Sequence, residues 1–186
     1  MGTQQQKYWK VLLVGDHCLD IYHYGVCDRL SPEAPVPVLK QTKIETKLGM
    51  SSNVKLNLES YGLKVKHHMN QKPIEKHRIV DTRFGQHIVR YDIGEEEPLK
   101  EMDYKTIKSP MADVLVISDY NKGFVTRAVA EHLCEVYKGK PIFVDSKKTD
   151  LTCYSNCYIK INEKEFKSIQ KMPKEVDFIV TLGSRG

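Results

Sequence analysis

Short runs of apolar residues that end abruptly at polar residues constrain the fold of this chain more than any other feature. Four such runs cover residues 11–14, 114–117, 141–144 and 178–180, and a weaker one covers residues 157–161. A run that is apolar on both faces is typical of a strand buried in a parallel sheet. Helical patterns lie between these runs, and strand–helix–strand order predicts an α/β fold with a mostly parallel central sheet.

Two helices are expected in this pattern. Residues 51–61 place Val54, Leu58 and Tyr61 on one face, and Gly62 ends the segment. Residues 125–136 carry apolar side chains at helical spacing, with Thr126 as the candidate cap. Both segments therefore predict amphipathic helices that pack on the sheet.

Two further segments do not fit the buried strands. Residues 36–40 and 88–92 have the pattern of exposed strands, and Pro32, Pro35 and Pro37 disfavour a central position in a sheet. We therefore expect residues 20–48 and 74–95 to form a small β-element that projects from the core.

Composition excludes several other classes of protein. A chain of 186 residues with 28% charged and 40% hydrophobic residues is an ordinary globular protein of about one domain. No apolar run is long enough for a membrane span, and the polar N-terminus predicts a cytoplasmic location. The net charge of +5 is spread along the chain, which indicates anionic small molecules and argues against nucleic acid.

The five cysteines are scattered and odd in number, which is typical of a reducing compartment. Cys153 and Cys157 have no matching second pair, so ordinary thiols are favoured over a zinc site.

Polar side chains follow the apolar runs, where each predicted strand ends. The residues are Asp16, Asp119, Asp145 with Lys147, and Asn162 with Glu165. Because ligands of parallel α/β sheets bind at the carboxyl ends of the strands, these side chains predict a shared cleft. Carboxylates, an amide and a lysine suit a polyol, a phosphate and hydrated Mg²⁺. A single strand that ends in Asp is more often a turn or a helix cap.

Five stretches, in this order, resemble the ribokinase-like (PfkB) carbohydrate kinases, and among them the D-glycero-β-D-manno-heptose 7-phosphate kinases of bifunctional ADP-heptose synthases. They are residues 14–20, 29–38, 48–58, 117–123, and 144–147 with 161–166. The segment Ser31-Pro32-Glu33-Ala34-Pro35-Val36-Pro37 is the most specific of these. The resemblance implies one incomplete ribokinase-like sandwich over residues 8–186, with the β-element as a lid that forms a homodimer.

The resemblance also implies roles for individual residues. Sugar hydroxyls would be bound by Asp16, Asp20, Gly49 and Asn53. Magnesium and phosphate would be bound indirectly by Asn162 and Glu165, with Asp145 and Lys147 near the phosphoryl group transferred from Mg-ATP. Lys147 would offset the charge that develops there.

Three departures from the family pattern change the functional expectation. Met50 replaces a second glycine, and the chain between Lys66 and Lys76 is too short for a core strand–helix unit of the family. No Gly-x-Gly-Asp segment, the family's anion hole and catalytic base, occurs in these residues. We therefore expect the C-terminal part of the fold to be absent and phosphoryl transfer by this chain alone to be very weak.

Two alternative functions remain open. One is a non-catalytic descendant that binds a sugar phosphate or a protein partner. The other is a Rossmann-type nucleotide-binding domain, which is disfavoured because Gly15-Asp16 lacks the Gly-x-Gly-x-x-Gly fingerprint.

Overall fold

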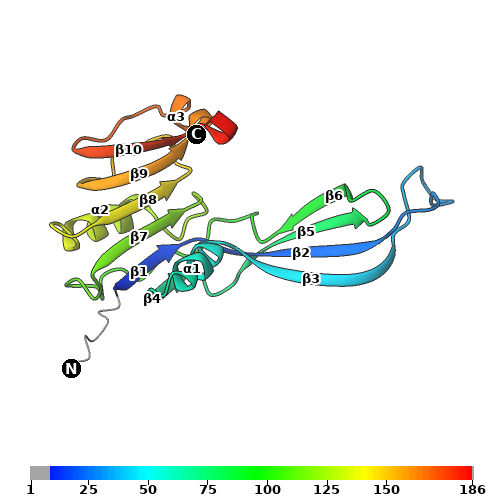
Figure 1. Cartoon of the computed structure of the whole chain (residues 1–186), viewed down its shortest axis with the longest axis horizontal. Coiled ribbons are helices and arrows are strands. Elements are labelled where there is room, and N and C mark those ends of the chain that lie inside the picture. The colour runs from blue at the N-terminus through cyan, green and yellow to red at the C-terminus, as the bar shows by residue number, and fades with distance from the viewer. Residues whose placement is uncertain (1–8, 186) are drawn as a thin grey trace, which may run out of the picture. The chain divides into compact units, whose positions relative to one another are not determined.

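The computed structural model describes residues 9–185, which form two compact units (Figure 1). Of the described residues, the first unit contains 9–16, 50–71 and 98–185. The second unit contains residues 17–49 and 72–97, which include both segments expected to form the β-element.

A six-stranded, wholly parallel sheet forms the centre of the first unit. Its strands run in the order β10-β9-β8-β7-β1-β4. They are β1 (Lys10–Gly15), β4 (Lys64–Met69), β7 (Val114–Asp119), β8 (Ile142–Ser146), β9 (Cys157–Asn162) and β10 (Val176–Thr181). All five apolar runs of the sequence lie in this sheet, which confirms the α/β class. Only β4, which is an edge strand of mixed polarity, had no such signal.

Helix α2 (Arg127–Val136) packs on the sheet as its pattern predicted. It buries Val129, Ala130, Leu133 and Cys134. Thr126 is its N-cap, because its Oγ1 accepts a hydrogen bond from the backbone N–H of Val129 at 3.3 Å. The predicted cap is therefore confirmed, although the helix begins two residues later than the apolar pattern.

Helix α1 (Ser51–Ser60) also forms, and Val54 and Leu58 of its predicted apolar face are half-buried, but Tyr61 lies beyond the helix and does not belong to that face. The fully buried residues are Ser51 and Ser52 at its first turn, whereas Tyr61 is 84% exposed. The helix begins in contact with the sheet, since Ser51 N donates to the Asp16 carbonyl at 2.9 Å. Its start is thus fixed by polar contacts that an apolar periodicity does not report.

Two short helices complete the first unit. Helix α3 (Glu163–Lys167) follows β9 directly, and the 3-10 helix η1 (Gly183–Arg185) follows β10. No helix in residues 9–185 is long and apolar enough to cross a membrane.

A four-stranded sheet forms the second unit, in the order β3-β2-β5-β6. Its strands are β2 (His17–Val26), β3 (Lys40–Met50), β5 (Ile74–Asp81) and β6 (Gln86–Ile93). The predicted strand at 88–92 lies within β6. The predicted strand at 36–40 was wrong, because β3 begins only at Lys40 and Pro37 forms an isolated bridge with Leu30. Proline has no N–H with which to continue a ladder.

At Gly15, the carboxyl end of β1 comes very close to the backbone of β7 and to the start of α1. A Cβ atom added there would lie 2.3 Å from the Ser118 carbonyl oxygen and 2.8 Å from the Ser51 Cβ. Strands β1 and β7 and the start of α1 therefore meet at a point where a side chain has no room.

We expect Gly15→Ala to lower the free energy of unfolding by about 3 kcal/mol, since the added methyl group forces backbone to move. Gly62→Ala is the control: its methyl group meets nothing within 4 Å, so only the positive φ of 77° is penalised, by about 1 kcal/mol. Urea unfolding of both variants measures the difference, and equal losses would contradict the close approach.

Candidate functional site

Asp16 lies at the end of β1 and is fully buried. Its Oδ2 accepts hydrogen bonds from the backbone N–H groups of Tyr120 at 2.6 Å and Lys122 at 3.4 Å. Its Oδ1 is buried and has no hydrogen-bond partner among the described residues. Buried polar atoms are nearly always paired, so this oxygen points to an external donor.

The charge of Asp16 is destabilised by its surroundings. Burial, followed by the nearby carboxylate of Asp119, raises the pKa of Asp16 to about 6. The two backbone N–H groups and the ammonium of Lys148 act in the opposite direction. Asp16 therefore changes its protonation state close to neutral pH.

Asp119 ends β7 and forms the centre of a buried polar network. Its Oδ2 accepts hydrogen bonds from Ser146 Oγ at 2.9 Å, Tyr154 OH at 2.5 Å and Lys148 Nζ. Its Oδ1 accepts from Asn121 N at 2.8 Å, which closes the turn after the strand. Lys148 supplies the positive charge that a buried carboxylate requires.

The four residues predicted to serve magnesium and phosphate lie together at the ends of β8 and β9. Lys147 Nζ ion-pairs with Glu165 and lies 3.8 Å from Asp145 Oδ1, and Lys160 Nζ contacts Asp145 Oδ2 at 3.0 Å. Burial alone would raise the pKa of Glu165, but the hydrogen bonds from Lys147 and the Asn162 backbone outweigh it and hold this pKa below its usual value. At this end of the sheet, two carboxylates are thus in contact with two lysines.

Asn162 and Glu165 also form a complete capping box for α3. Asn162 Oδ1 accepts from Glu165 N at 2.9 Å, and Glu165 Oε2 accepts from Asn162 N at 3.1 Å. Both Glu165 oxygens are therefore engaged by the chain. A cation at this place would be held through its water shell, which suits Mg²⁺.

The residues predicted to bind the sugar divide between the two units. In the first unit, Asn53 is exposed on the first turn of α1, and Met50 precedes that helix with a left-handed φ of 50°. That conformation favours glycine, so Met50 is strained where the family pattern has its second glycine.

In the second unit, Asp20 and Gly49 are neighbours. Asp20 Oδ1 accepts from Arg78 Nη1 at 2.6 Å, and a Cβ atom at Gly49 would lie 2.4 Å from Asp20 Oδ2. Gly49 is therefore required for the fit of β3 against the Asp20 carboxylate.

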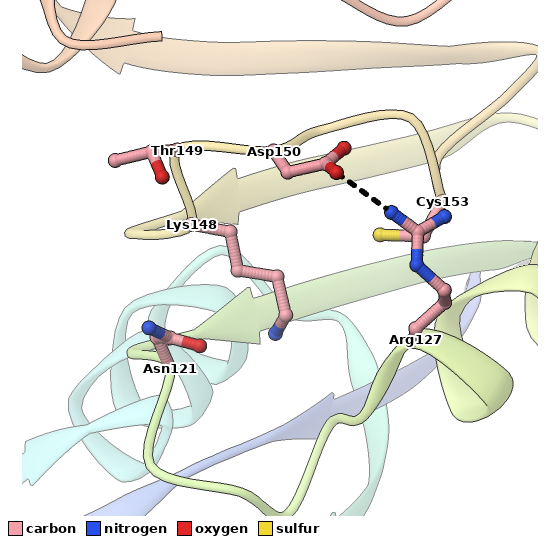
Figure 2. A pocket seen from close by; sticks show the side chains of 6 residues that line it. All are labelled: Asn121, Arg127, Lys148, Thr149, Asp150 and Cys153. Carbon is pink, nitrogen blue, oxygen red and sulfur yellow. Dashed lines mark ion pairs between the residues drawn. The ribbon is translucent and has the colours of Figure 1, made fainter. Parts of the chain in front are cut away.

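A cavity of about 310 Å³ lies beside the Asp119 network (Figure 2). It is lined by Asn121, Arg127, Lys148, Thr149, Asp150 and Cys153. Arg127 is paired there with Asp150 at 3.1 Å. No group of three or more His, Cys, Asp or Glu residues suited to a metal occurs in residues 9–185, and the five cysteines are free thiols.

The sequence prediction missed Lys148, Ser146 and Tyr154 as members of the site. Lys148 follows Lys147 directly, and nothing in the pattern distinguishes a lysine that pairs with Glu165 from one that enters the core. Only the polar ending of the strand, Ser146-Lys147-Lys148, was a signal for this region.

The wholly parallel sheet with polar residues along its carboxyl edge, together with a small second sheet, defines the ribokinase-like fold of the carbohydrate kinases. Arabidopsis thaliana ribokinase complexed with ribose and ATP matches 97% of this chain and 74% of its own, with a TM-score of 0.55 and 14% identity. Phosphofructokinase-2 from Escherichia coli in complex with fructose-6-phosphate matches 97% and 76%, with a TM-score of 0.57 and 13% identity.

Within this class, the chain is similar in sequence to the bifunctional HldE proteins. The HldE protein of Caulobacter vibrioides is 34% identical over 190 residues, which cover 83% of this chain and 39% of the relative. That of Granulibacter bethesdensis is 30% identical and covers 78% and 37%. The chain thus spans less than half the length of these relatives, and no family model matches it.

The HldE protein of Sulfurimonas denitrificans is 26% identical over 226 residues, which cover 93% of this chain and 47% of the relative. Since this chain has 186 residues, the match includes residues that this chain lacks. In this chain, residues 70–73 alone join β4 to β5.

We expect the raised pKa of Asp16 to appear as a pH-dependent loss of stability. The folded pKa of about 6 exceeds the unfolded value near 3.9, so the protonated form stabilises the fold and this contribution is lost as pH rises through 4 to 6. Asp16→Asn has no such titration. Its stability relative to the unaltered chain should therefore rise by about 3 kcal/mol between pH 3.5 and pH 8.

The measurement is urea unfolding across that range. Asp177→Asn, at an exposed carboxylate of β10, is the control for the loss of one carboxylate. If the difference in the free energy of unfolding between Asp16→Asn and the unaltered chain does not change with pH, the pKa of Asp16 is the same in the folded and the unfolded chain.

Proposed function

We propose that this chain binds a sugar phosphate at the Asp16 end of the sheet and is a sugar-kinase-like protein. The observation that carries the proposal is the fully buried Asp16 carboxylate with one unpartnered oxygen. A sugar hydroxyl is a donor of the right kind, because it can give a hydrogen bond to that oxygen without adding charge. The similarity to HldE proteins supports a heptose 7-phosphate as the sugar.

In a kinase reaction, the sugar hydroxyl would attack the terminal phosphorus of Mg-ATP, and the bond to the leaving ADP would break. Lys147, between Asp145 and Glu165, would offset the charge on the transferred group. Asn162 and Glu165 would hold the water shell of Mg²⁺. The hydroxyl proton needs an acceptor, which the family takes from its Gly-x-Gly-Asp segment, so these residues assayed alone should turn over very slowly.

A second candidate is a non-catalytic protein that keeps the sugar site or binds a protein partner. The residues that this chain lacks relative to the Sulfurimonas protein favour it, because a kinase under selection for turnover would not readily lose part of its core. A coupled assay for ADP release distinguishes the two. Binding of the sugar phosphate without turnover, even after a Gly-x-Gly-Asp segment is restored, would support the non-catalytic function.

Thermal unfolding with each ligand added separately tests the sugar site. Heptose 7-phosphate at about 100 times its dissociation constant should stabilise the chain by about 2.7 kcal/mol. Asp16→Asn should abolish that shift, because an amide no longer offers a carboxylate to the hydroxyl, whereas Asp177→Asn should keep it. If heptose 7-phosphate does not shift the unfolding temperature, the proposed sugar site is wrong, whether or not Mg-ATP gives a shift.

We also propose that the second unit forms a homodimer through one face of its sheet. Val89, Tyr91 and Ile93 alternate along β6 and are 44–51% exposed, and Ile44 and Leu48 on β3 are exposed as well. An apolar sheet face of this kind is normally covered by a second layer, and a second copy offers a self-complementary one.

Val89→Asp should convert the dimer to a monomer, since a charge would be buried without a partner. Phe84→Asp, in the turn between β5 and β6, is the control, because it replaces an exposed apolar residue away from that face. Size-exclusion chromatography with light scattering measures the mass. A monomer already in the unaltered chain would rule out this interface.

A further inference from the structure

The two adjacent lysines after β8 have different partners. Lys147 is one-third exposed and contacts Glu165 and Asp145. Lys148 is only 15% exposed and turns into the core, where its Nζ contacts Asp119 Oδ2 and donates to the Val125 carbonyl at 2.7 Å. In Figure 2, Lys148 extends from the loop after β8 toward the end of β7, where Asn121 is drawn. Its role is therefore separate from that of Lys147.

Lys148 stabilises Asp119 by charge, whereas the other donors to this carboxylate are neutral. Ser146 Oγ, Tyr154 OH and Asn121 N satisfy its oxygens but leave its negative charge uncompensated. A buried carboxylate that loses its cation is strongly destabilised. The position of Asp119 thus depends on Lys148.

Asp119 in turn shapes the turn that binds Asp16. Its Oδ1 holds Asn121 N, and Asn121 takes a left-handed φ of 57°. This turn directs the N–H groups of Tyr120 and Lys122 at Asp16 Oδ2. One Asp16 oxygen is thereby occupied by the chain, while Oδ1 stays available.

We propose that Lys148 is a positioning residue for Asp16: it neutralises Asp119, and through the 119–122 turn it fixes the orientation and charge state of the Asp16 carboxylate. This inference rests on the proposed function in one respect, since it assigns Asp16 to the sugar hydroxyl. The connection from Lys148 to Asp16 stands on the hydrogen bonds alone.

The electrostatics of the cluster supports this connection. Burial and then Asp119 raise the pKa of Asp16, whereas the two N–H groups and, to a smaller extent, Lys148 lower it. On its other side, Lys148 faces the cavity with Arg127, Asp150 and the Cys153 thiol, whose pKa burial raises to about 11. Without Lys148, two buried carboxyls would share the site with no adjacent cation, and Asp16 would take up its proton at higher pH.

The test compares Lys148→Met with Lys147→Met and with the conservative Lys148→Arg. Carboxyl ¹³C signals of labelled aspartate are followed against pH by NMR, with Asp16→Asn to assign the signal. We expect the Asp16 carboxyl of Lys148→Met to take up its proton about one pH unit higher than in the unaltered chain. Lys147→Met and Lys148→Arg should leave this titration unchanged.

The second measurement is calorimetric binding of heptose 7-phosphate. Lys148→Met should weaken binding about tenfold, because the carboxylate that accepts the hydroxyl is misplaced and more often protonated. If Lys148→Met does not fold, the double variant Lys148→Met/Asp119→Asn removes both charges together. It should fold, titrate Asp16 at or below its original pH, and recover most of the affinity, since the amide oxygen that replaces the carboxylate can still accept from Asn121.

The outcomes separate this inference from the proposed function. An unchanged carboxyl titration in Lys148→Met, or a double variant that titrates like the single one, would overturn the positioning role. If the unaltered chain binds no heptose 7-phosphate, the proposed function fails, while the NMR titration still decides whether Lys148 controls Asp16.

Discussion

Asp16 holds together the part of the first unit on which the candidate site depends. Its backbone N–H donates to Ser118 at the end of β7, and its carbonyl accepts from Ser51 at the start of α1. Its side chain accepts from the turn that follows Asp119. One residue thus joins β1, β7 and α1, and Gly15 beside it provides the close approach that these bonds require. Burying a carboxylate at such a contact costs free energy of folding. We interpret that cost as the consequence of keeping one oxygen free for a ligand.

The carboxyl edge of the sheet has two electrostatic regions. Around Asp16 and Asp119 the groups are buried, and one internal lysine compensates two carboxylates. At the ends of β8 and β9, Asp145 and Glu165 are partly exposed and contact Lys147 and Lys160. Solvent screens the second region, so its charges can rearrange around a ligand at little cost. The first region is buried and closely hydrogen-bonded, and burial raises the pKa of its Asp16 carboxyl to about 6. A neutral hydroxyl suits the first region, and a phosphate with a hydrated cation suits the second.

The second unit shows how the same residue types serve structure and recognition. Asp20 is held by Arg78, and Gly49 leaves room for the Asp20 carboxylate at the end of β3. The opposite side of this sheet exposes apolar side chains along β6 and β3, and the hydrogen-bonded side chains of His23, His77 and Glu75 lie on the β6 residues' face as well. This face is therefore mixed, with apolar side chains that a second layer could cover.

The sequence by itself determined the α/β class, the five core strands with an apolar run, helix α2 with its Thr126 cap, and the acidic residues at the strand ends. These follow from local patterns: a run that is apolar on both faces must be buried, and parallel strands bring their carboxyl ends to one edge. The tertiary structure alone decided which polar groups pair at that edge. Lys147 and Lys148 are neighbours with the same chemistry, yet one reaches Glu165 and the other enters the core to reach Asp119, because their partners come from segments distant in the chain. Likewise, α1 is buried through two serines because its first turn lies against Asp16, which is distant in the chain, and no local periodicity encodes that contact.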